Sequence, residues 1–234
     1  MLDDESNDVI VNYGYFTVKS DKPQANRVWR KITAYDAMNT ILNADVLTWF
    51  RGLTFPMTLA AFRNSFFTHL GITQKVQSLI NDSFSIPGGF TASEYLSGKT
   101  IITAICELNG VFGHINRDGN FEYVSFGGNA GFVCPPFENN SVTYEDYTTD
   151  LITKITMRGS ASDVGTSVGV DGNEYIITGN PLIYGTEGES TLITALNNLL
   201  AKIGTISFRP YTVGKTIGNP CVELGDAITV NTTY

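Results

Sequence analysis

The chain has few charged residues. Asp, Glu, Lys and Arg make up only 16% of its 234 residues, whereas they make up about a quarter of a typical globular domain. The 23 acidic residues outnumber the 15 basic ones, which gives a net charge of −8. A protein that grips nucleic acid carries a basic patch, so the composition argues against specific nucleic-acid binding. A low charge content also suits a subunit that buries surface in an assembly.

Cysteine and histidine are scarce as well. Cys106, Cys134 and Cys221 are odd in number and widely spaced, which argues against a disulfide framework and fits synthesis in a reducing cytoplasm. His69 and His114 are the only histidines. A zinc site needs three or four converging ligands, and the cysteines show no paired ligand spacing. We therefore interpret both histidines as structural and expect no metal site and no cofactor.

Long apolar runs are also absent. No stretch approaches the about 20 apolar residues that span a bilayer, so we expect no membrane insertion. The first five residues, Met1 to Glu5, are acidic and do not form a signal peptide. Glycine, threonine and asparagine are plentiful instead, which is typical of a β-rich protein with many turns.

The stretch from Lys99 to Phe126 is the most strongly patterned part of the chain. Ile101, Ile102, Ile105 and Leu108 recur at helical spacing and predict a helix with one apolar face. Asn109-Gly110 tolerates positive φ and predicts the end of that helix. Asp118-Gly119 lies between two short β-type runs, 111–116 and 120–126, and predicts a hairpin turn. A helix packed on its own hairpin is a structural unit that requires no catalytic group.

Strands and helices are expected on the N-terminal side of this unit. The β-branched and aromatic run at 9–18 and the alternating run at 27–32 predict two strands. A helix is expected at 34–42, capped by Thr33 with Asp36 at its third position. A second helix is expected at 59–70, capped by Thr58 and ended by Gly71. Residues 76–80 indicate a short further helix.

The character of the chain changes after Phe126. A glycine-rich stretch at 127–131 and Cys134-Pro135-Pro136 predict a linker. Strands are expected at 151–157, 174–178, 206–213 and 227–230, with a mobile loop at 160–170 and an amphipathic helix capped by Ser190. The sequence therefore predicts an α+β fold.

Motifs for catalysis or nucleotide binding are weak. Gly98-Lys99-Thr100 and Gly214-Lys215-Thr216 resemble part of a phosphate-binding loop, but the required earlier glycine is replaced by Ser93 and Arg209. The chain contains no Gly-x-Ser-x-Gly elbow and no His-Glu-x-x-His helix. We interpret Lys99-Thr100 as a helix start and expect no catalytic, cofactor-binding or metal-binding residues.

Two further patterns allow more than one interpretation. Asp171-Gly172-Asn173-Glu174 is acid-rich, but its spacing does not match a calcium loop, and a hairpin turn explains it better. Tyr13, Tyr15, Phe16 and Trp29 could stack on sugars. Aromatic residues in alternating strands more often belong to the core or to a subunit interface.

Four segments together resemble a known family. Residues 99–126, with Glu107 to Ile115 at their centre, and the segments 14–18, 32–38 and 218–228 occur in the same order in tail proteins of prophages from Gram-positive bacteria. That family is similar to the baseplate hub of contractile tails and the tail-tip hub of siphophages. The resemblance covers most of the chain, and no single segment is decisive.

The resemblance implies a fold, partners and a location. It implies hub-like barrel domains with an inserted α/β domain of helices plus a β-hairpin. Mapped onto this sequence, residues 1–31 are remnant strands of a first barrel, 32–141 the inserted domain, and 142–234 a second barrel with one helix, incomplete at its C-terminus. It also implies that further chain precedes Met1.

By the same resemblance the protein is a virion component and not an enzyme. It implies a homotrimer that contacts tail tube, distal tail, baseplate and tape measure proteins, and a ring lumen that is not basic. A tail-associated cell-wall peptidase or lysin component, and a carbohydrate-binding host-recognition module, are the alternative functions.

Overall fold

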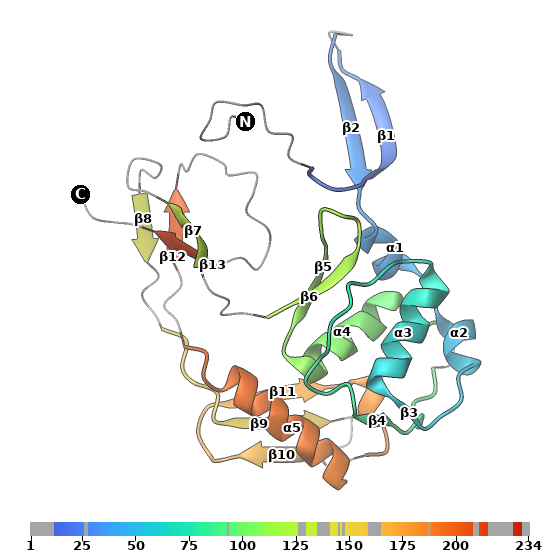
Figure 1. Ribbon diagram of the computed structural model, residues 1–234, viewed down its shortest axis with the longest axis vertical. Helices are drawn as coiled ribbons and strands as arrows, with labels where there is room; N and C mark the ends of the chain where they lie inside the picture. Colours follow the sequence, from blue (N-terminus) through green and yellow to red (C-terminus); the bar gives the residue numbers. More distant parts are fainter. Residues whose placement is uncertain are drawn as a thin grey trace.

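The computed structural model describes residues 12–25, 28–92, 94–125, 130–134, 141–144, 146, 148–158, 165–186, 188–207, 211–214 and 227–230. These residues form a mixed α+β fold, as the sequence predicts (Figure 1). The described helices are α1 (Met38–Asn43), α2 (Leu47–Arg51), α3 (Leu59–Leu70), α4 (Gly98–Asn109), α5 (Ser190–Ile203) and the 3₁₀-helix η2 (Pro181–Ile183). The described strands are β1 (Thr17–Pro23), β2 (Arg30–Tyr35), β3 (Met57–Thr58), β4 (Ser85–Ile86), β5 (Phe112–Ile115), β6 (Phe121–Val124), β7 (Ala130–Cys134), β8 (Ser141–Tyr144), β9 (Lys154–Arg158), β10 (Thr166–Gly169), β11 (Glu174–Thr178), β12 (Tyr211–Gly214) and β13 (Ala227–Val230).

Helix α4 is the expected helix of the central unit, and it contacts α1, α5, η2 and β5. The N–H of Thr100 donates to the Ser97 hydroxyl at 3.1 Å and caps the helix start. Gly110 ends the helix in the left-handed region, with φ of 56°. Ile101, Ile105 and Leu108 are fully buried. The periodic apolar face of the sequence is therefore the buried face of α4.

Helix α3 also confirms its prediction at both ends. The N–H of Ala61 donates to the Thr58 side chain at 3.2 Å, and Gly71 closes the helix with φ of 67°. An aromatic cluster fixes its buried side: the Trp49 ring of α2 lies 5.3 Å from the ring of Phe62 and 5.4 Å from that of Phe66, centroid to centroid. Such tilted aromatic pairs add packing energy beyond their buried area.

Helix α1 begins four residues later than the sequence predicts. Thr33 is not its cap, because residues 30–35 form β2 and pair with β1. Asp36 acts instead in the turn that follows, where its carboxylate accepts the N–H of Met38 at 3.0 Å. Asp36 was expected inside the helix, but its short side chain binds a backbone N–H outside it, and the helix starts after this turn.

The expectation of a helix at 76–80 is wrong, because this segment is extended and runs beside β6. The N–H of Lys75 donates to the Phe121 carbonyl, and the N–H of Phe121 donates to the Thr73 carbonyl, both at 2.8 Å. The Gln77 side chain then makes the two hydrogen bonds that the backbone of a neighbouring strand would make. Its amide donates to the Tyr123 carbonyl and its oxygen accepts the Tyr123 N–H, both at 2.9 Å. These bonds hold the segment extended.

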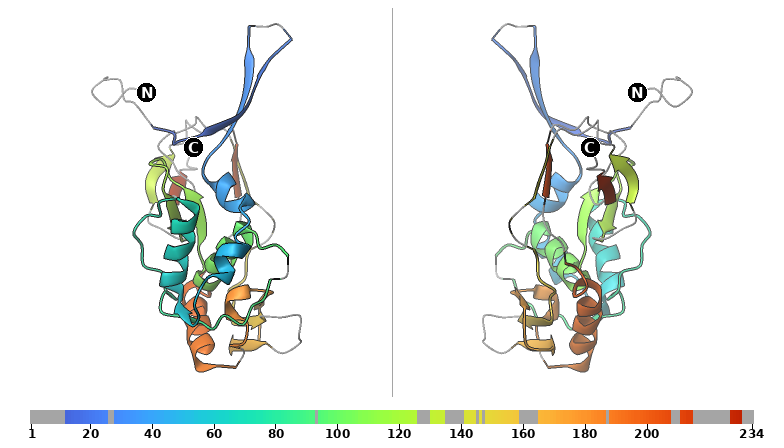
Figure 2. Two further views of the ribbon diagram at one scale, coloured as in Figure 1. Left: turned by 90° about the vertical axis from the view of Figure 1, so that its right-hand side faces the viewer. Right: turned by 90° about the vertical axis from the view of Figure 1, so that its left-hand side faces the viewer.

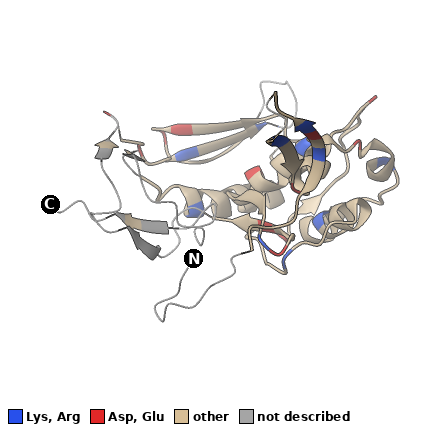
Figure 3. Ribbon diagram, turned by 90° about the horizontal axis from the view of Figure 1, so that it is seen from above, with Lys and Arg blue, Asp and Glu red and all other residues tan. Residues whose placement is uncertain are grey.

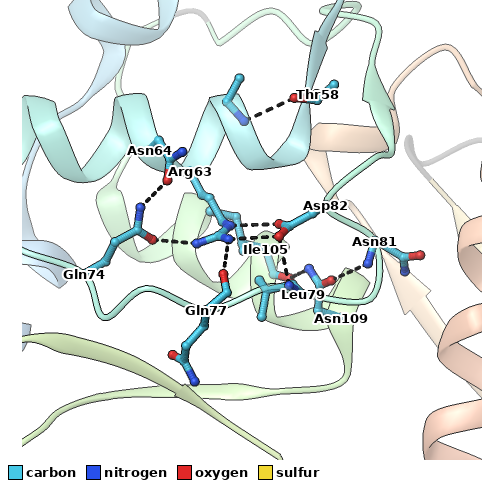
Figure 4. A network of polar contacts seen from close by, with 11 residues as sticks. Thr58, Arg63, Asn64, Gln74, Gln77, Leu79, Asn81, Asp82, Ile105 and Asn109 are labelled. Atoms are coloured by element: carbon cyan, nitrogen blue, oxygen red, sulfur yellow. Dashed lines mark hydrogen bonds and ion pairs between the residues drawn. The ribbon is translucent and has the colours of Figure 1, made fainter.

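Arg63 of α3 anchors the same segment from the other side (Figure 4). Its guanidinium is buried and donates to both carboxylate oxygens of Asp82, at 2.8 and 2.9 Å, and to the Gln74 side chain at 2.8 Å. Burial opposes the charge of Arg63, but the hydrogen bonds and charge of Asp82 outweigh this effect and raise the pKa of Arg63. The ion pair thus fixes the route of a loop that has no secondary structure of its own.

The β5–β6 hairpin forms as predicted, with Phe112 opposite Val124 and Ile115 opposite Phe121. The turn is closed by the N–H of Gly119, which donates to the Asn116 carbonyl at 2.9 Å. The Asn116 side chain also accepts the N–H groups of Asp118 and Asn120. Gly119 has φ of 79°, a conformation that favours glycine.

A three-stranded sheet packs against α5 in the second half of the chain. Its order is β10-β9-β11, with β9 antiparallel to β10 and parallel to β11. Part of the expected loop at 160–170 is therefore a strand, β10, whose Val168 is buried under α5; residues 159–164 lie outside the described part. Helix α5 starts at Ser190 with Glu189 as its N-cap, one residue before the predicted cap.

Two small sheets bring distant segments together. Strand β12 pairs antiparallel with β8, and β13 pairs parallel with β7. Strand β13 has the predicted bounds, and β12 covers only the end of the predicted strand at 206–213. In the part of the chain that the structure describes, every sheet has two or three strands and none closes into a barrel. The hub-like barrels stay a prediction.

The N-terminal strands lie further along the chain than the sequence predicts. The expected strands at 9–18 and 27–32 become β1 and β2, an antiparallel ribbon that projects away from the helices (Figures 1 and 2). Pro23 ends β1 opposite Arg30, which a two-stranded ribbon tolerates because each strand has an open edge. Residues 9–11 lie outside the described part.

The hydrophobic core includes residues from both sides of the boundary expected at 141/142. Leu108 and Phe121 belong to the same buried cluster as Ile155, Leu196 and Leu199. The Asn81 side chain links the two parts directly, donating to the carbonyls of Leu108 at 2.6 Å and Ala195 at 3.0 Å. The division into 1–31, 32–141 and 142–234 stays a prediction. Among the described helices, none is long and apolar enough to cross a membrane.

Truncation of Leu108 tests the packing of α4. Leu108→Ala removes a fully buried side chain and should lower the free energy of unfolding by about 2–5 kcal/mol. Urea unfolding followed by circular dichroism measures the change. A loss below about half a kcal/mol would show that this face of α4 is not packed as described.

Removal of Asp82 tests the Arg63 anchor. Asp82→Ala leaves a buried guanidinium without its carboxylate and should cost about 3 kcal/mol of stability. Asp21→Ala is the matched control, because the Asp21–Arg30 pair is exposed and surface pairs contribute little. Equal unfolding midpoints for the two variants would contradict the role given to Arg63.

Candidate functional site

An apolar groove opens beside α4, and its lining is mostly hydrophobic. Its volume is about 510 Å³, within the range of roughly 300–1,000 Å³ that is usual for ligand pockets. Gly110 lets α5 approach closely, because a Cβ there would lie 2.8 Å from Ile203. We call this hollow the α4 groove; its walls include Leu42 of α1, Ile102, Cys106 and Glu107 of α4, Tyr175 of β11 and Ile203 of α5.

Glu107 is the carboxylate of the α4 groove. Burial raises its pKa, although the Asn180 amide opposes this effect by donating to Glu107 Oε2 at 3.0 Å. Asn180 is itself buried and held in place: its amide also donates to the Ala104 carbonyl at 3.1 Å, and its oxygen accepts the Leu182 N–H at 3.0 Å. Glu107 also lines a smaller polar hollow of about 270 Å³ next to Lys99. Glu107 therefore lines both hollows, as does Thr103.

Cys106 is the second titratable group in the groove. Burial, and to a smaller extent the charge of Glu107, raise the pKa of its thiol to about 12. A nucleophilic cysteine needs a lowered pKa, so this thiol is protonated and unreactive at neutral pH. The groove can therefore enclose an apolar group and accept a hydrogen bond, but Cys106 does not make it a catalytic site.

The β1–β2 ribbon is a second candidate surface, because its apolar side chains are exposed. Val18 lies opposite Ala34 and Asp21 lies opposite Ile32, with a register irregularity between Val18 and Ser20. Side chains alternate between the faces of a strand, so all four lie on one face of the ribbon. Val18 is 59% exposed and Ile32 60% exposed. The exposed side chains of Val18 and Ile32 make this face a candidate interaction surface.

The aromatic residues that the sequence singled out lie at both ends of this ribbon. Tyr13, Tyr15, Phe16 and Trp29 are all more than half exposed, so the core interpretation is wrong for them. Tyr15 lies over the β5–β6 turn, where a Cβ on Gly119 would be 2.9 Å from its ring. Trp29 lies at the far end, where its carbonyl accepts the Gln24 N–H at 2.8 Å. The interface interpretation stays a prediction.

Lys99 and Thr100 form the start of α4, as expected from their sequence. Both residues are exposed, and the Thr100 hydroxyl lies 2.8 Å from the capping hydroxyl of Ser97. Their hydrogen bonding is that of a capped helix. Gly214 ends β12, and Lys215 and Thr216 lie outside the described residues.

The two histidines lie on different elements. His69, in the last turn of α3, stacks on the Trp49 ring with centroids 5.8 Å apart. His114 of β5 lies opposite Glu122 of β6. Among the described residues, no group of three or more His, Cys, Asp and Glu side chains is placed to hold a metal ion. The expectation that the chain has no metal, cofactor or catalytic residue stays a prediction.

The acid-rich segment 171–174 is a turn, but it does not join paired strands. It crosses the start of β9, where the Thr153 N–H donates to the Asn173 carbonyl at 2.9 Å. The carboxylates of Asp171 and Glu174 lie 3.2 and 3.8 Å from the Lys154 ammonium. The hairpin expectation is therefore wrong in its strand pairing, although the turn itself is confirmed.

The groove was not found from the sequence. Its walls come from segments between Met38 and Ile203, and no local pattern connects them. The one available signal was Glu107, a carboxylate next to Cys106 in an otherwise apolar helix. That signal is weak, because most such residues face solvent.

The pH dependence of stability tests the buried position of Glu107. Its pKa is raised above the usual 4.5, so the folded chain holds the proton to higher pH than the unfolded chain, and stability falls as the pH rises through this interval. Glu107→Gln should remove this fall, so its stability relative to wild type should increase as the pH rises above the usual pKa of a glutamate. Urea unfolding at a series of pH values measures it.

Glu122→Gln is the matched control with the opposite sign. Burial opposes ionisation of Glu122, but hydrogen bonds from Lys75 and Asn116 outweigh it and lower the pKa. The ionised Glu122 stabilises the folded chain above the usual pKa of a glutamate, and this stabilisation is lost as the pH falls. Glu122→Gln should therefore be less stable than wild type at neutral pH. The same pH profile for both variants would contradict the position of Glu107.

Comparison with solved structures shows a distant likeness. No protein-family model matches the sequence, and no curated protein matches it. Among solved structures, the chain is similar to the 43 kDa tail protein of prophage MuSo2 from Shewanella oneidensis, with 14% identity and a TM-score of 0.48. The match covers 92% of this chain and 66% of that one, so the chain spans less than two thirds of that protein's length. A likeness at this level assigns no family and no activity.

Proposed function

We propose that the chain is a structural phage tail protein, a hub at the distal end of the tail tube that connects the tube to baseplate or host-recognition components. The observation that carries the proposal is the β1–β2 ribbon, which projects from the body (Figure 2). Its side chains Val18 and Ile32, and Trp29 at its far end, are exposed. A two-stranded ribbon is marginally stable alone, and its exposed apolar face is typical of a subunit within an assembly.

The sequence resemblance supports the same role. The segments 14–18, 32–38, 99–126 and 218–228 follow the order found in the tail proteins of Gram-positive prophages. In this proposal the chain is part of a homotrimeric hub with barrel-like domains and contacts tail tube, distal tail, baseplate and tape measure proteins. It is a virion component and not an enzyme. The low content of charged residues is in keeping with such a buried subunit.

A carbohydrate-binding role at the tail is the second candidate. The exposed rings of Tyr13, Tyr15 and Trp29 favour it, because exposed aromatic rings stack on sugars. A glycan-array screen tests this role. The raised pKa of the Cys106 thiol gives no support to the cell-wall peptidase alternative. Incubation with host peptidoglycan tests it.

Immunogold electron microscopy tests the tail proposal. Antibodies raised against the chain should label particles released from the source strain, with gold at the distal tip of the tail and not along the shaft or on the capsid. The chain should also fail to retain duplex DNA in a gel shift at physiological salt, because its net charge is −8. Absence of the chain from purified particles, or salt-sensitive DNA binding, would overturn the proposal.

A further inference from the structure

Three places in the sequence put an asparagine or an aspartate directly before a glycine: Asn109-Gly110, Asp118-Gly119 and Asp171-Gly172. At such a place the backbone nitrogen of the glycine can attack the carbonyl carbon of the preceding side chain, because glycine has no Cβ to hinder the approach. The attack needs a side chain that can turn toward this nitrogen and a backbone N–H that is not held in a hydrogen bond. The fold therefore determines which of the three places reacts.

The Asn109-Gly110 pair is held at both reacting groups. The Asn109 side chain is fully buried, its amide donates to the Ile105 carbonyl at 2.8 Å, and its oxygen accepts the Asn81 N–H at 3.0 Å. The Gly110 N–H donates to the Cys106 carbonyl at the end of α4. Neither group can reach the other unless the end of the helix opens.

The Asp118-Gly119 pair is held at its nitrogen. The Gly119 N–H donates to the Asn116 carbonyl at 2.9 Å and closes the β5–β6 turn. The ring of Tyr15 covers the glycine, since a Cβ there would lie 2.9 Å from that ring. Attack by this nitrogen therefore first requires the turn to open.

The Asp171-Gly172 pair has neither restraint. Both residues are exposed, and the Asp171 side chain is 99% exposed. Hydrogen bonds lie on either side of the pair: the Val170 N–H donates to the Thr153 carbonyl at 3.0 Å, and the Asn173 carbonyl accepts the Thr153 N–H at 2.9 Å. Between them, no hydrogen bond within the described part of the chain holds the Gly172 N–H. The attacking nitrogen is therefore available.

The contact of the Asp171 carboxylate leaves its side chain able to turn. The Lys154 ammonium lies 3.2 Å from this carboxylate and 3.8 Å from that of Glu174, so basic and acidic residues lie side by side where β9 and β11 begin (Figure 3). An ion pair with so exposed a carboxylate contributes little. Because Lys154 is shared between two carboxylates, it does not fix the position of the Asp171 side chain.

We infer that Asp171-Gly172 is a site of spontaneous isomerisation, at which Asp171 becomes isoaspartate. The Gly172 nitrogen forms a bond to Asp171 Cγ, and its proton leaves with the carboxyl hydroxyl as water, which gives a succinimide ring. Water then adds to the main-chain carbonyl carbon of Asp171 and breaks the bond from that carbon to the Gly172 nitrogen. The chain now runs through Cβ and Cγ of Asp171, and its mass is unchanged because one water is lost and one is gained.

This change lengthens the backbone by one carbon atom at a point where strand register matters. Asn173 follows directly, and its carbonyl accepts the N–H groups of Thr153 and Lys154 at 2.9 and 3.3 Å. Glu174 then begins β11 opposite Lys154 of β9. We therefore expect isomerisation to weaken the β9–β11 pairing and to lower the stability of the chain.

Ageing of the purified chain at neutral pH tests the inference. Isoaspartyl methyltransferase quantifies isoaspartate, and electron-transfer fragmentation of tryptic peptides locates it. Asp118 is the matched control, because both Asp-Gly pairs are followed by an asparagine, Asn120 or Asn173. Isoaspartate should form about tenfold faster at position 171 than at position 118, since the Gly119 N–H must first leave a hydrogen bond.

Unfolding and substitution provide the controls. In concentrated urea both Asp-Gly-Asn segments are released from the fold, so isoaspartate should form at equal rates at the two positions. Asp171→Glu should abolish formation at position 171, because a glutamate has to close a larger ring, whereas Asp118→Glu should leave it unchanged. Aged wild type should unfold at a lower urea concentration than fresh protein, and Asp171→Glu should not change with age. Circular dichroism checks that both variants are folded.

The outcomes are distinct. Equal rates at positions 118 and 171 in the folded chain, or faster formation at position 118, would overturn the inference. Formation at position 171 in urea but not in the folded chain would also overturn it, because the fold would then protect this pair as well. Isomerisation at position 171 without a loss of stability would contradict the effect expected on the β9–β11 pairing.

Discussion

The fold depends on burial of α4 on more than one side. Ile101, Ile105 and Leu108 are fully inside the core, and the helix contacts α1 from the first half of the chain and α5 from the second. Because a helix that is apolar over a wide face must be covered by several elements, neither half supplies a complete core. Asn81 reinforces this by donating to carbonyls at the end of α4 and in α5. The groove beside α4 is the part of its surface that these elements leave uncovered.

Local patterns predicted the elements whose signals are complete within their own residues. Helices α3 and α4 each have a capping hydroxyl, a periodic apolar face and a terminal glycine in the left-handed region, so three independent signals agree. The loop after α3 could not be predicted, because it is held extended by Arg63, on α3, and by the backbone of Tyr123, 46 residues further along the chain. Apolar spacing alone predicts a helix for such a segment, because the long-range hydrogen bonds that hold it extended leave no pattern in the sequence.

The same reasoning explains what could be predicted of the candidate site. The sequence identified the aromatic residues Tyr13, Tyr15 and Trp29 as candidates for the core or for a binding surface, because large rings bury much area wherever they meet a partner. Whether that partner is the core or another molecule depends on where the ribbon lies, and only the structure showed that these rings are exposed. The α4 groove is formed by residues from α1, α4, β11 and α5, so its existence depends on tertiary packing.

The β1–β2 ribbon combines edges that are protected against association with a face that exposes apolar side chains. Two-stranded ribbons have two open edges, and proteins protect such edges from aggregation with lysine and proline; Lys19, Lys22 and Pro23 do so along β1. One face of the same ribbon nevertheless exposes Val18 and Ile32. Protection of the edges together with an uncovered apolar face favours a specific partner over random association, because charge excludes most surfaces and admits an acidic one.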